Sequence, residues 1–484
     1  MKTSKLFVRL AYLYTVLPVF MFVIGWCNFP TVCIGGVIIL ISLYFTCKNA
    51  PALWMPQNTQ QKRLLFFVLL TSLTWVCLSG IGALVFQNSD HSTRNPIFEI
   101  LVLLPWPVIL ENPPVILTYY IGFWLPSALL GKLVHSTLFG FHMQIVWATL
   151  GIFLFFYLIL NTLKRKSYWP VLLFILFSGL DVIGCLSNGY ETLVKVPWEH
   201  MEWWYPYSQF SSFTTQLFWT FNQAIPLWVT VMLMYHEKNN KSLCFLYACL
   251  FLQSTLPALG LFPFVIYWCI KNGNYKLSFK TFFTQLQKAF FSSLTPQNLL
   301  GTLCVIVIIF PYLSGNIAGG YYSFTHVFSQ INIWHWLFFF LLPEVGLYML
   351  CLWYTNRKNM LYYLCIACFL IYPFITVGFG PDFCLKGTLP ALVLLYVMVT
   401  QTLANASFRK THRFLFYALL ALLCLGSLTP LHEFTRTIYF THLGETKVAP
   451  SLFLHNFFGY TENNLFLKYF GKNPPVLDQT KPEG

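Results

Sequence analysis

The chain has 484 residues, of which 57% are hydrophobic, 19% aromatic and only 9% charged. Soluble domains carry about 25% charged residues, so this composition excludes an ordinary water-soluble enzyme. The formal net charge of +14 is explained by basic loops that face anionic lipid. We therefore expect membrane lipid, and no nucleic acid, as a partner.

Runs of about 20 apolar residues recur along the chain, and each is long enough to cross a bilayer as a helix. Lys and Arg cluster between many of these runs, and the positive-inside rule places such clusters in the cytoplasm. The pattern predicts an all-α polytopic transmembrane helix bundle in a bacterial inner membrane, with a cytoplasmic N-terminus and an extracytoplasmic C-terminus. About 11 full spans are expected, near residues 8–26, 30–47, 63–86, 143–163, 168–185, 212–235, 298–316, 331–353, 359–378, 387–405 and 412–428.

Two further apolar segments must not each cross the membrane once if all of the basic clusters are to lie on the cytoplasmic side. Residues 115–133 are expected to lie at the outer interface or to re-enter it. Residues 242–270 are interrupted by Pro257 and Pro263 and are expected to form a helical hairpin that returns to the cytoplasm. The expected organisation is a transmembrane bundle at 1–428, with outer loops 87–114 and 186–211, and an extracytoplasmic C-terminal segment at 429–484.

The first outer loop contains Asp90, Arg94, Asn95 and Glu99. If Pro96 starts a helix at its first position, Glu99 faces back toward the loop. This arrangement makes the four polar residues candidates for a catalytic or substrate-binding site. The alternative is that Asp90 or Asn95 only caps the helix and that the carboxylates are solvated.

The second outer loop holds the densest polar cluster, with Glu199, His200, Glu202, Trp203 and Trp204. The tryptophans alone would suit an aromatic belt at headgroup depth, but a belt does not require carboxylates between them. Glu199 and Glu202 are three residues apart and would share one face of a helix. Such a pair is suited to hold a divalent cation or to share a proton, and His200 is the weaker candidate.

Polar residues also occur within or at the edges of predicted spans: Asp181, Asn222 and Glu344. A carboxylate inside a bilayer costs at least about 2.5 kcal/mol, so it normally faces a polar cavity or a partner. Asp181 lies close enough to the outer face to join the loop residues, and Asn222 is a further candidate for substrate binding. We expect Asp90, Asp181, Glu199 and Glu202 to converge on one outward-facing cavity, whereas Glu344 is deeper and is equally suited to a structural role.

Other motifs add little. The fourteen cysteines lie mainly in apolar runs, where thiols behave as small hydrophobes, and no Walker or dinucleotide-binding sequence is present. The residues do resemble a group of bacterial polytopic membrane proteins whose layout is similar to that of the GT-C superfamily of lipid-linked-sugar glycosyltransferases. The resemblance covers about a quarter of the chain and is carried by Asp90 to Leu133, with Pro105-Trp106-Pro107 and TYYIGFWLPSALLGK, by Glu202-Trp203-Trp204, and by Phe221-Asn222-Gln223.

The resemblance implies a membrane glycosyltransferase in which an acidic residue of the first outer loop is the general base, here Asp90, and the donor is a polyprenyl-phosphate sugar. Such an enzyme needs lateral access for the donor, a saccharide or protein acceptor, and a carboxylate that deprotonates the acceptor hydroxyl. The phosphate needs a cation, for which Arg94, Lys132 or a divalent metal are candidates.

A different class of function stays open at this level. A multi-pass transporter, or a flippase of lipid-linked saccharide, would also combine many spans with broken helices and intramembrane carboxylates. In that reading the important residues are Pro257, Pro263, Pro343 and Glu344. The location of the indispensable acids separates the two classes, because catalysis requires carboxylates in the loops and transport requires them near the midplane.

Overall fold

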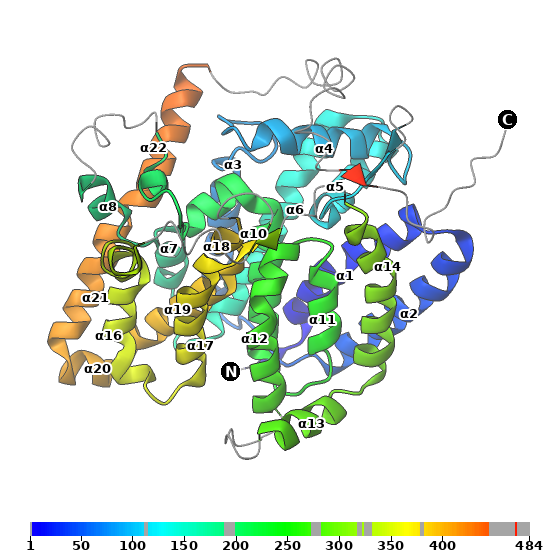
Figure 1. The fold of residues 1–484 in the computed structure, drawn as a ribbon. Helices are drawn as coiled ribbons and strands as arrows, with labels where there is room; N and C mark the ends of the chain where they lie inside the picture. Colours follow the sequence, from blue (N-terminus) through cyan, green and yellow to red (C-terminus); the bar gives the residue numbers. More distant parts are fainter. Residues whose placement is uncertain are drawn as a thin grey trace.

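The computed structural model describes residues 2–110, 115–187, 199–272, 282–316, 322–323, 332–377, 382–444 and 470–471, and these form a helical bundle with only short strands (Figure 1). The N-terminal half contains α1 (Leu6–Trp26), α2 (Phe29–Asn49), α3 (Thr59–Cys77), α4 (His91–Leu103), α5 (Leu125–Leu133), α6 (Thr137–Leu160), α7 (Trp169–Ile175) and α8 (Asp181–Ser187). The middle contains α10 (Phe213–His236), α11 (Leu243–Leu250), α12 (Thr255–Asn272), α13 (Phe282–Ser292) and α14 (Thr302–Ser314).

The C-terminal part contains α15 (Ile333–His335), α16 (Leu347–Asn356), α17 (Met360–Ile371), α18 (Asp382–Gly387), α19 (Leu389–Leu403), α20 (Ala406–Thr411), α21 (Arg413–Gly426) and α22 (Leu428–His442). Short 3-10 helices are η1 (Gly122–Trp124), η2 (Met201–Trp204) and η7 (Tyr372–Phe374), and π-helical segments are η4 (Gln297–Gly301) and η6 (Trp336–Gly346). The strand pairs are antiparallel: β1 (Thr3–Ser4) with β2 (Leu53–Trp54), β4 (Val115–Leu117) with both β3 (Ile109–Leu110) and β7 (Phe470–Gly471), and β5 (Tyr322–Ser323) with β6 (Thr376–Val377).

Within the described residues, eight helical segments are long and apolar enough to cross a membrane. This finding confirms the predicted all-α polytopic class. The eight segments are Leu6–Trp26, Phe29–Asn49, Thr137–Leu160, Phe213–His236, Gln297–Ser314, Ile333–Asn356, Asp382–Leu403 and Arg413–His442.

The span predicted at 168–185 is wrong, because α7 and α8 are separated by a non-helical segment at 176–180. The backbone there makes a close approach to η6, since a Cβ added at Gly179 would lie 2.0 Å from a carboxylate oxygen of Glu344. Hydropathy alone does not reveal such a break. The span predicted at 63–86 is also too long, because α3 ends at Cys77 and Gly80 follows with a left-handed φ of +85°.

The predicted hairpin at 242–270 is present as α11 and α12, which lie side by side in Figure 1. Its two ends meet, because the side chain of Asn240 donates to the carbonyl of Cys269 at 2.6 Å. The turn lies at 251–254, ahead of both prolines, and Pro263 stands inside α12. The other segment that was expected not to cross, 115–133, contains η1 and α5, and the nine residues of α5 extend only about 14 Å.

The domain boundary expected after residue 428 falls at the first residue of α22, within one long helical segment. Residues 413–442 are a candidate span of 30 residues, in which α22 directly follows α21. Residues 429–442 are thus part of the bundle, and most of the remaining C-terminal segment lies outside the described residues. The same is true of 188–198 in the second outer loop.

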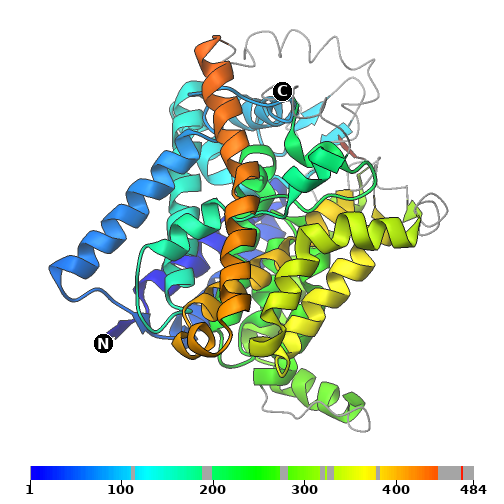
Figure 2. The same ribbon diagram turned by 90° about the vertical axis from the view of Figure 1, so that its left-hand side faces the viewer.

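Basic residues gather at one end of the bundle, which we call the basic end. It contains the N-terminus, α13 and α20, whereas α4 and α5 lie at the opposite end, the α4 end (Figures 1 and 2). At the basic end the Lys5 ammonium donates to the carbonyl of Lys48 at 2.9 Å, so chain segments that carry basic clusters meet there. The arrangement agrees with the charge pattern expected from the sequence.

The centre of the bundle is α10, in which 94% of the apolar window is buried. Aromatic packing surrounds it, and the rings of Trp75 and Trp228 stack with centroids 5.9 Å apart. The helix is kinked at Thr220, whose φ of −132° and ψ of 31° are not helical. Pro226 lacks the N–H that would bond four residues back, which weakens the helix just after this point. The kink separates Trp219 from Asn222, and each contributes to a different polar cluster.

Candidate functional site

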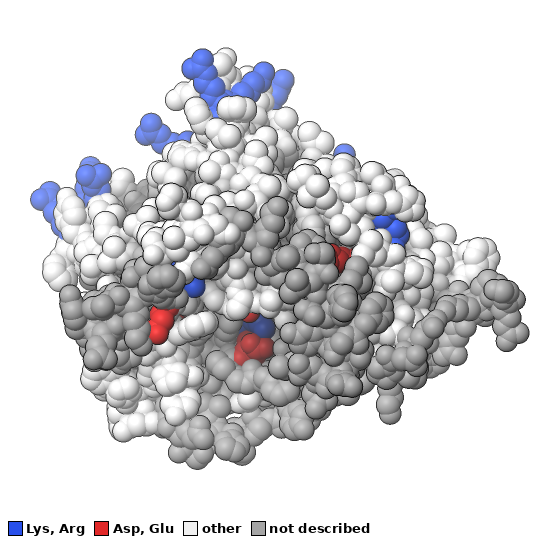
Figure 3. Space-filling view, turned by 90° about the horizontal axis from the view of Figure 1, so that it is seen from above, with Lys and Arg blue, Asp and Glu red and all other residues white. Residues whose placement is uncertain are grey.

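The first polar cluster lies at the α4 end and comprises Asp90, Arg94, Asn222, Asp382 and Lys386; we call it the Asp90 site. It is assembled from α4, α10 and α18. On the face that the α4 end presents, acidic and basic side chains lie together near the middle (Figure 3). The loop before α4 is fixed to α10, because the Asn88 amide donates to the carbonyl of Phe218 at 2.8 Å.

Asp90 occupies the N-cap position of α4, yet its side chain makes no capping hydrogen bond. Instead, Arg94 donates from Nη2 to Asp90 Oδ2 at 2.7 Å. The helix begins at His91, so the expected start at Pro96 is wrong, and the earlier start gives Asp90 and Arg94 the i, i+4 spacing of helical neighbours. The capping alternative for Asp90 therefore does not describe its side chain.

Arg94 is held in place on three sides. Its side chain is 8% exposed, whereas that of Asp90 is 41% exposed. Arg94 Nε donates to Asn222 Oδ1 at 3.3 Å, and the guanidinium lies 6.0 Å from the ring centroid of Phe221. Two buried donors of this group, Arg94 Nη1 and Asn222 Nδ2, have no hydrogen-bond partner among the described residues.

A second pair repeats this arrangement on α18. Lys386 Nζ lies 3.0 Å from Asp382 Oδ2, and the Lys386 side chain is buried while that of Asp382 is 41% exposed. Lys386 also lies within electrostatic range of Asp90 and Tyr119. The backbone that carries Lys386 is packed tightly on α12, because a Cβ added at Gly260 would lie 1.9 Å from the carbonyl oxygen of Gly387.

Sequence analysis missed Asp382 and Lys386. The available signal is weak: a lone lysine four residues after an acid, directly before the apolar run of α19. Lys386 belongs to no basic cluster of the sequence, and this isolation from the cytoplasmic clusters was a second available signal. Only the fold brings it to Asp90.

The Asp90–Arg94 pair of this site is ionised at neutral pH. Burial would raise the pKa of Asp90, but the charge of Arg94 and its hydrogen bond outweigh burial, so the pKa lies below its usual value. Burial would likewise lower the pKa of Arg94, and the Asp90 carboxylate raises it instead. A carboxylate and two cations therefore face the same region.

Two other candidate residues, Asn95 and Lys132, make structural hydrogen bonds away from Asp90. Asn95 donates to Gln87 Oε1 at 2.9 Å and ties α4 to the preceding loop. Lys132 donates to the carbonyls of Val102 and Leu104, and thus caps the C-terminal end of α4. Among the described residues, no hydrogen bond or ion pair joins Asn95 or Lys132 to Asp90, so the position of Lys132 does not support the phosphate-binding role considered for it.

Glu99 is buried, and its Oε1 has no hydrogen-bond partner among the described residues. Burial raises the pKa of this carboxyl to about 7. A group with this pKa is partly protonated at neutral pH. Its location one turn beyond Asn95 on α4 gives it no direct contact with Asp90.

The second polar cluster is buried and comprises Asp181, His200, Glu202, Glu344, Glu433 and Arg436; we call it the buried acidic cluster. Trp204 Nε1 donates to Asp181 Oδ1 at 3.1 Å and to Glu344 Oε1 at 3.3 Å. Asp181 Oδ2 accepts from Ser178 and from Thr429. Burial raises the pKa of Asp181, and the nearby charge of Glu202 raises it further.

His200 is the cation at the centre of this cluster. Its Nδ1 lies 2.7 Å from Glu433 Oε1 and its Nε2 lies 3.5 Å from Glu202 Oε2. Burial would lower the pKa of His200, but the two carboxylates outweigh burial and raise it to about 10. Glu433 also accepts from Arg436 Nη1 and Trp219 Nε1, both at 3.0 Å.

Both oxygens of Glu202 are occupied, because Gln209 donates to Oε2 at 2.9 Å and the backbone N–H of Ser212 donates to Oε1 at 2.8 Å. Glu199 is exposed whereas Glu202 is buried, so the expected common helical face is wrong. Trp203 is 59% exposed, and its ring lies edge-on to His200. Glu433 and Arg436, which complete the cluster, were assigned to the outer C-terminal segment by sequence analysis.

The structure thus brings Asp181 and Glu202 together but places Asp90 in another set of contacts. Among the described residues, no hydrogen bond or ion pair joins Asp90 to Asp181 or Glu202. The kink of α10 explains the division, since Asn222 faces Arg94 while Trp219 faces Glu433. The described residues contain no group of three or more His, Cys, Asp or Glu side chains suited to hold a metal ion.

An apolar pocket of about 750 Å³ lies between α11, α12, α13 and α14. Its lining reaches Leu313 at the end of α14. The neighbouring Tyr312 donates to the carbonyl of Tyr119 at 3.0 Å, and Arg94 and Lys386 both lie within electrostatic range of Tyr119. The lining includes Tyr247, Phe251, Leu259, Phe262, Ile306 and Phe310.

Comparison with known proteins adds no family assignment. No protein-family model matches the chain, and neither the curated proteins nor the solved structures contain a match. The functional argument therefore rests on the chemistry of the two polar clusters and of the apolar pocket.

Proposed function

We propose that this protein is an integral-membrane glycosyltransferase that uses a polyprenyl-phosphate-linked sugar as donor at the outer face of a bacterial inner membrane. The observation that carries the proposal is the pair of buried, unpartnered donors Arg94 Nη1 and Asn222 Nδ2 beside the half-exposed carboxylate of Asp90. A buried donor without a partner costs about 1–3 kcal/mol. A phosphate oxygen would satisfy both donors.

The two cations and the carboxylate suit different parts of one reaction. Arg94 and Lys386 would bind the phosphate and stabilise its charge as the bond to the sugar breaks. Asp90 would take the proton of the acceptor hydroxyl, whose oxygen forms the new bond to the anomeric carbon. The electron pair of the broken bond remains on the phosphate, and no further reactant is needed.

The accessibility of Asp90 supports this division of roles. Arg94 engages one carboxylate oxygen, while 41% of the Asp90 side chain remains exposed to an approaching acceptor. A base with a lowered pKa is fully ionised at neutral pH, which keeps it ready to accept a proton although it weakens its basicity. Glu202 is less suited to the role, because it is buried and both of its oxygens accept hydrogen bonds.

The apolar pocket between α11 and α14 supports a donor that carries a long lipid. Large hydrophobic side chains on its helices, including Phe262 and Phe310, are exposed on the surface of the bundle. The link from Tyr312 to Tyr119 connects the pocket's end with the region of Arg94 and Lys386. An isoprenoid chain in this pocket would place its phosphate toward the Asp90 site.

The charge distribution supports the orientation. The positive-inside rule assigns the basic end to the cytoplasm, which turns the Asp90 site and the α4 end outward. Donors on polyprenyl phosphate are presented to acceptors on this side. Saccharides or proteins of the cell envelope are thus the proposed acceptors.

The test compares two matched variants, Asp90→Asn and Asp382→Asn. Each carboxylate is 41% exposed and pairs with a buried cation four residues later. Loss of a general base lowers a rate about 10²- to 10⁴-fold, so we expect this loss for Asp90→Asn and a smaller effect for Asp382→Asn. The assay is sugar transfer from polyprenyl-phosphate donors in reconstituted vesicles. Full activity of Asp90→Asn would contradict the assignment.

A transporter or flippase is the second candidate, and one observation favours it. Glu344 lies in the π-helical segment η6 and is buried beside Asp181, and π-helical turns often mark functional positions. This reading predicts that Glu344→Gln abolishes movement of a lipid-linked saccharide while Asp90→Asn retains it. The glycosyltransferase reading predicts that Glu344→Gln mainly lowers stability.

A further inference from the structure

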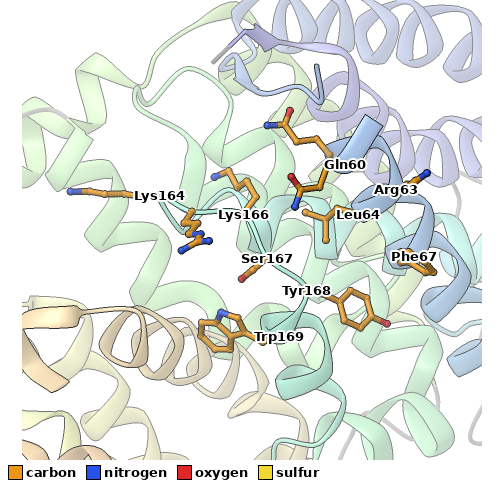
Figure 4. Close-up of a pocket in the computed structure, with 11 residues that line it drawn as sticks. Gln60, Arg63, Leu64, Phe67, Lys164, Lys166, Ser167, Tyr168 and Trp169 are labelled. Carbon is orange, nitrogen blue, oxygen red and sulfur yellow. The ribbon is translucent and has the colours of Figure 1, made fainter. Parts of the chain in front are cut away.

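A second pocket, unrelated to the Asp90 site, lies at the basic end and has a volume of about 830 Å³. One wall is the first half of α3 and the other is the loop from α6 to α7. Figure 4 shows Gln60 and Lys166 extending toward the space between these walls, with Trp169 along one side. In Figure 2, α3 diverges from the bundle toward the basic end, where the pocket lies.

The α3 wall is one stripe of the helix. Gln60, Leu64, Phe67 and Thr71 recur at intervals of three or four residues, so their side chains lie on the same face. The stripe is polar at Gln60 and apolar at Leu64 and Phe67. Its inner end is closed by a hydrogen bond between the hydroxyls of Thr71 and Tyr168.

The opposite wall changes in the same order. It begins with Lys164, Arg165 and Lys166, and ends with the aromatic rings of Tyr168 and Trp169. Arg63 of α3 adds a fourth positive charge, and none of the described lining residues is acidic. Both walls are therefore basic toward the surface and aromatic or aliphatic toward the membrane interior.

A pocket that is basic near the surface and apolar farther in matches the structure of an anionic phospholipid. An anionic phospholipid has a phosphate next to its headgroup and acyl chains beyond it, and basic pockets between helices at the cytoplasmic side hold such headgroups. Phe66 and Phe67 of α3 are exposed on the surface of the bundle, at 62% and 53%, so acyl chains would leave the pocket along lipid-facing residues. Burial lowers the pKa of Lys166 to about 8, and a nearby phosphate would favour its charged form.

We propose that this pocket binds the phosphate headgroup of an anionic phospholipid from the leaflet at the basic end. Arg63 and Arg165 hold the phosphate from opposite walls, Gln60, Gln61 and Ser167 supply hydrogen bonds to the headgroup, and Leu64, Phe67 and Trp169 contact the start of the acyl chains. The bound lipid fills the space between α3 and the loop after α6. The proposal is independent of the glycosyltransferase activity.

The experiment measures retained lipid on the full-length protein by native mass spectrometry. Protein is reconstituted in phosphatidylcholine containing phosphatidylglycerol, and the variant Arg63→Gln/Arg165→Gln is compared with Arg409→Gln/Arg413→Gln. All four arginines are exposed, so both variants remove two positive charges without disturbing the core. Each basic residue near an anionic surface contributes about 1 kcal/mol, or about five-fold in affinity.

We expect the wild type and the Arg409/Arg413 variant to retain phosphatidylglycerol in preference to phosphatidylcholine, and the Arg63/Arg165 variant to lose about 25-fold in affinity. Equal losses in both variants would overturn the proposal, because they would indicate general surface attraction. Glycerol 3-phosphate is the competing soluble probe. Full displacement of the lipid by millimolar glycerol 3-phosphate would also overturn it, since the site would then be one for a free phosphate ester.

Discussion

Replacing His200 by Gln should destabilise the protein more than almost any other exchange of similar size. The His200 side chain is 1% exposed, and it is the cation between Glu202 and Glu433. A pKa raised from 6.5 to about 10 corresponds to about 4–5 kcal/mol of favourable charge interaction. Breaking a buried ion pair typically costs about 3–5 kcal/mol, so we expect a loss of this size.

The matched control is His432→Gln. His432 is buried nearby, but neither of its ring nitrogens has a hydrogen-bond partner among the described residues. Its replacement should therefore change the free energy of unfolding by less than about 1 kcal/mol. Unfolding in detergent by denaturant can be followed through tryptophan fluorescence, because the ring of Trp219 lies 4.9 Å from that of His200.

The dependence on pH gives a second readout of the same interaction. The pKa of His200 is raised in the folded state, so its stabilisation is fully present below about pH 6.5 and is lost as pH rises through about 10. The wild type should lose this contribution across that window, and His200→Gln should not. A variant that unfolds within 1 kcal/mol of the wild type at pH 6 would refute the reasoning.

Two further predictions concern other buried positions. Burial raises the pKa of Glu99 to about 7 in the folded state, against 4.5 when unfolded. The free energy of unfolding should therefore fall by up to about 1.4 kcal/mol per pH unit as the pH rises from 4.5 to 7. Glu99→Gln should flatten this part of a stability–pH curve, and an unchanged slope would contradict the raised pKa. Gly260→Ala should destabilise by about 1–3 kcal/mol and lower activity by displacing α18, because the added Cβ would lie 1.9 Å from the Gly387 oxygen. Gly36→Ala, whose nearest contact would be 3.6 Å, should be tolerated, and equal melting temperatures for the two variants would argue against the close packing.

The sequence predicted the class of the fold because hydropathy and charge are local properties. Apolar runs and basic clusters are sufficient to indicate a polytopic bundle. The hairpin at 242–270 was predicted from its two prolines, although the turn at 251–254 lies ahead of both. The break at 176–180 was not predictable, because it depends on how Gly179 packs against Glu344 in a distant helix. Because residues 176–180 are mostly apolar, the predicted span at 168–185 ran through the break.

The candidate site was predictable only in part, for a related reason. Asp90, Arg94 and Asn222 were proposed from two separate segments, and the fold joins them. Lys386 was missed because its spacing of four residues from Asp382 is a weak signal, and only the fold brings it near Asp90. His200 was ranked below its neighbouring acids, yet it holds Glu202 and Glu433 together, a role that exists only once α22 has packed against the second outer loop.

The most direct test of the central claim separates phosphate binding from proton transfer at the Asp90 site. Binding of a polyprenyl phosphate to protein in lipid nanodiscs is measured for the wild type, Arg94→Gln and Asp90→Asn, alongside sugar transfer. A hydrogen bond to a charged group contributes about 1.5–3 kcal/mol, so Arg94→Gln should bind at least about ten-fold more weakly. Asp90→Asn should bind as tightly as the wild type or more tightly, because a negative charge has been removed, yet should transfer sugar about 10²- to 10⁴-fold more slowly. Unchanged binding by Arg94→Gln, or transfer by Asp90→Asn at the wild-type rate, would contradict the account.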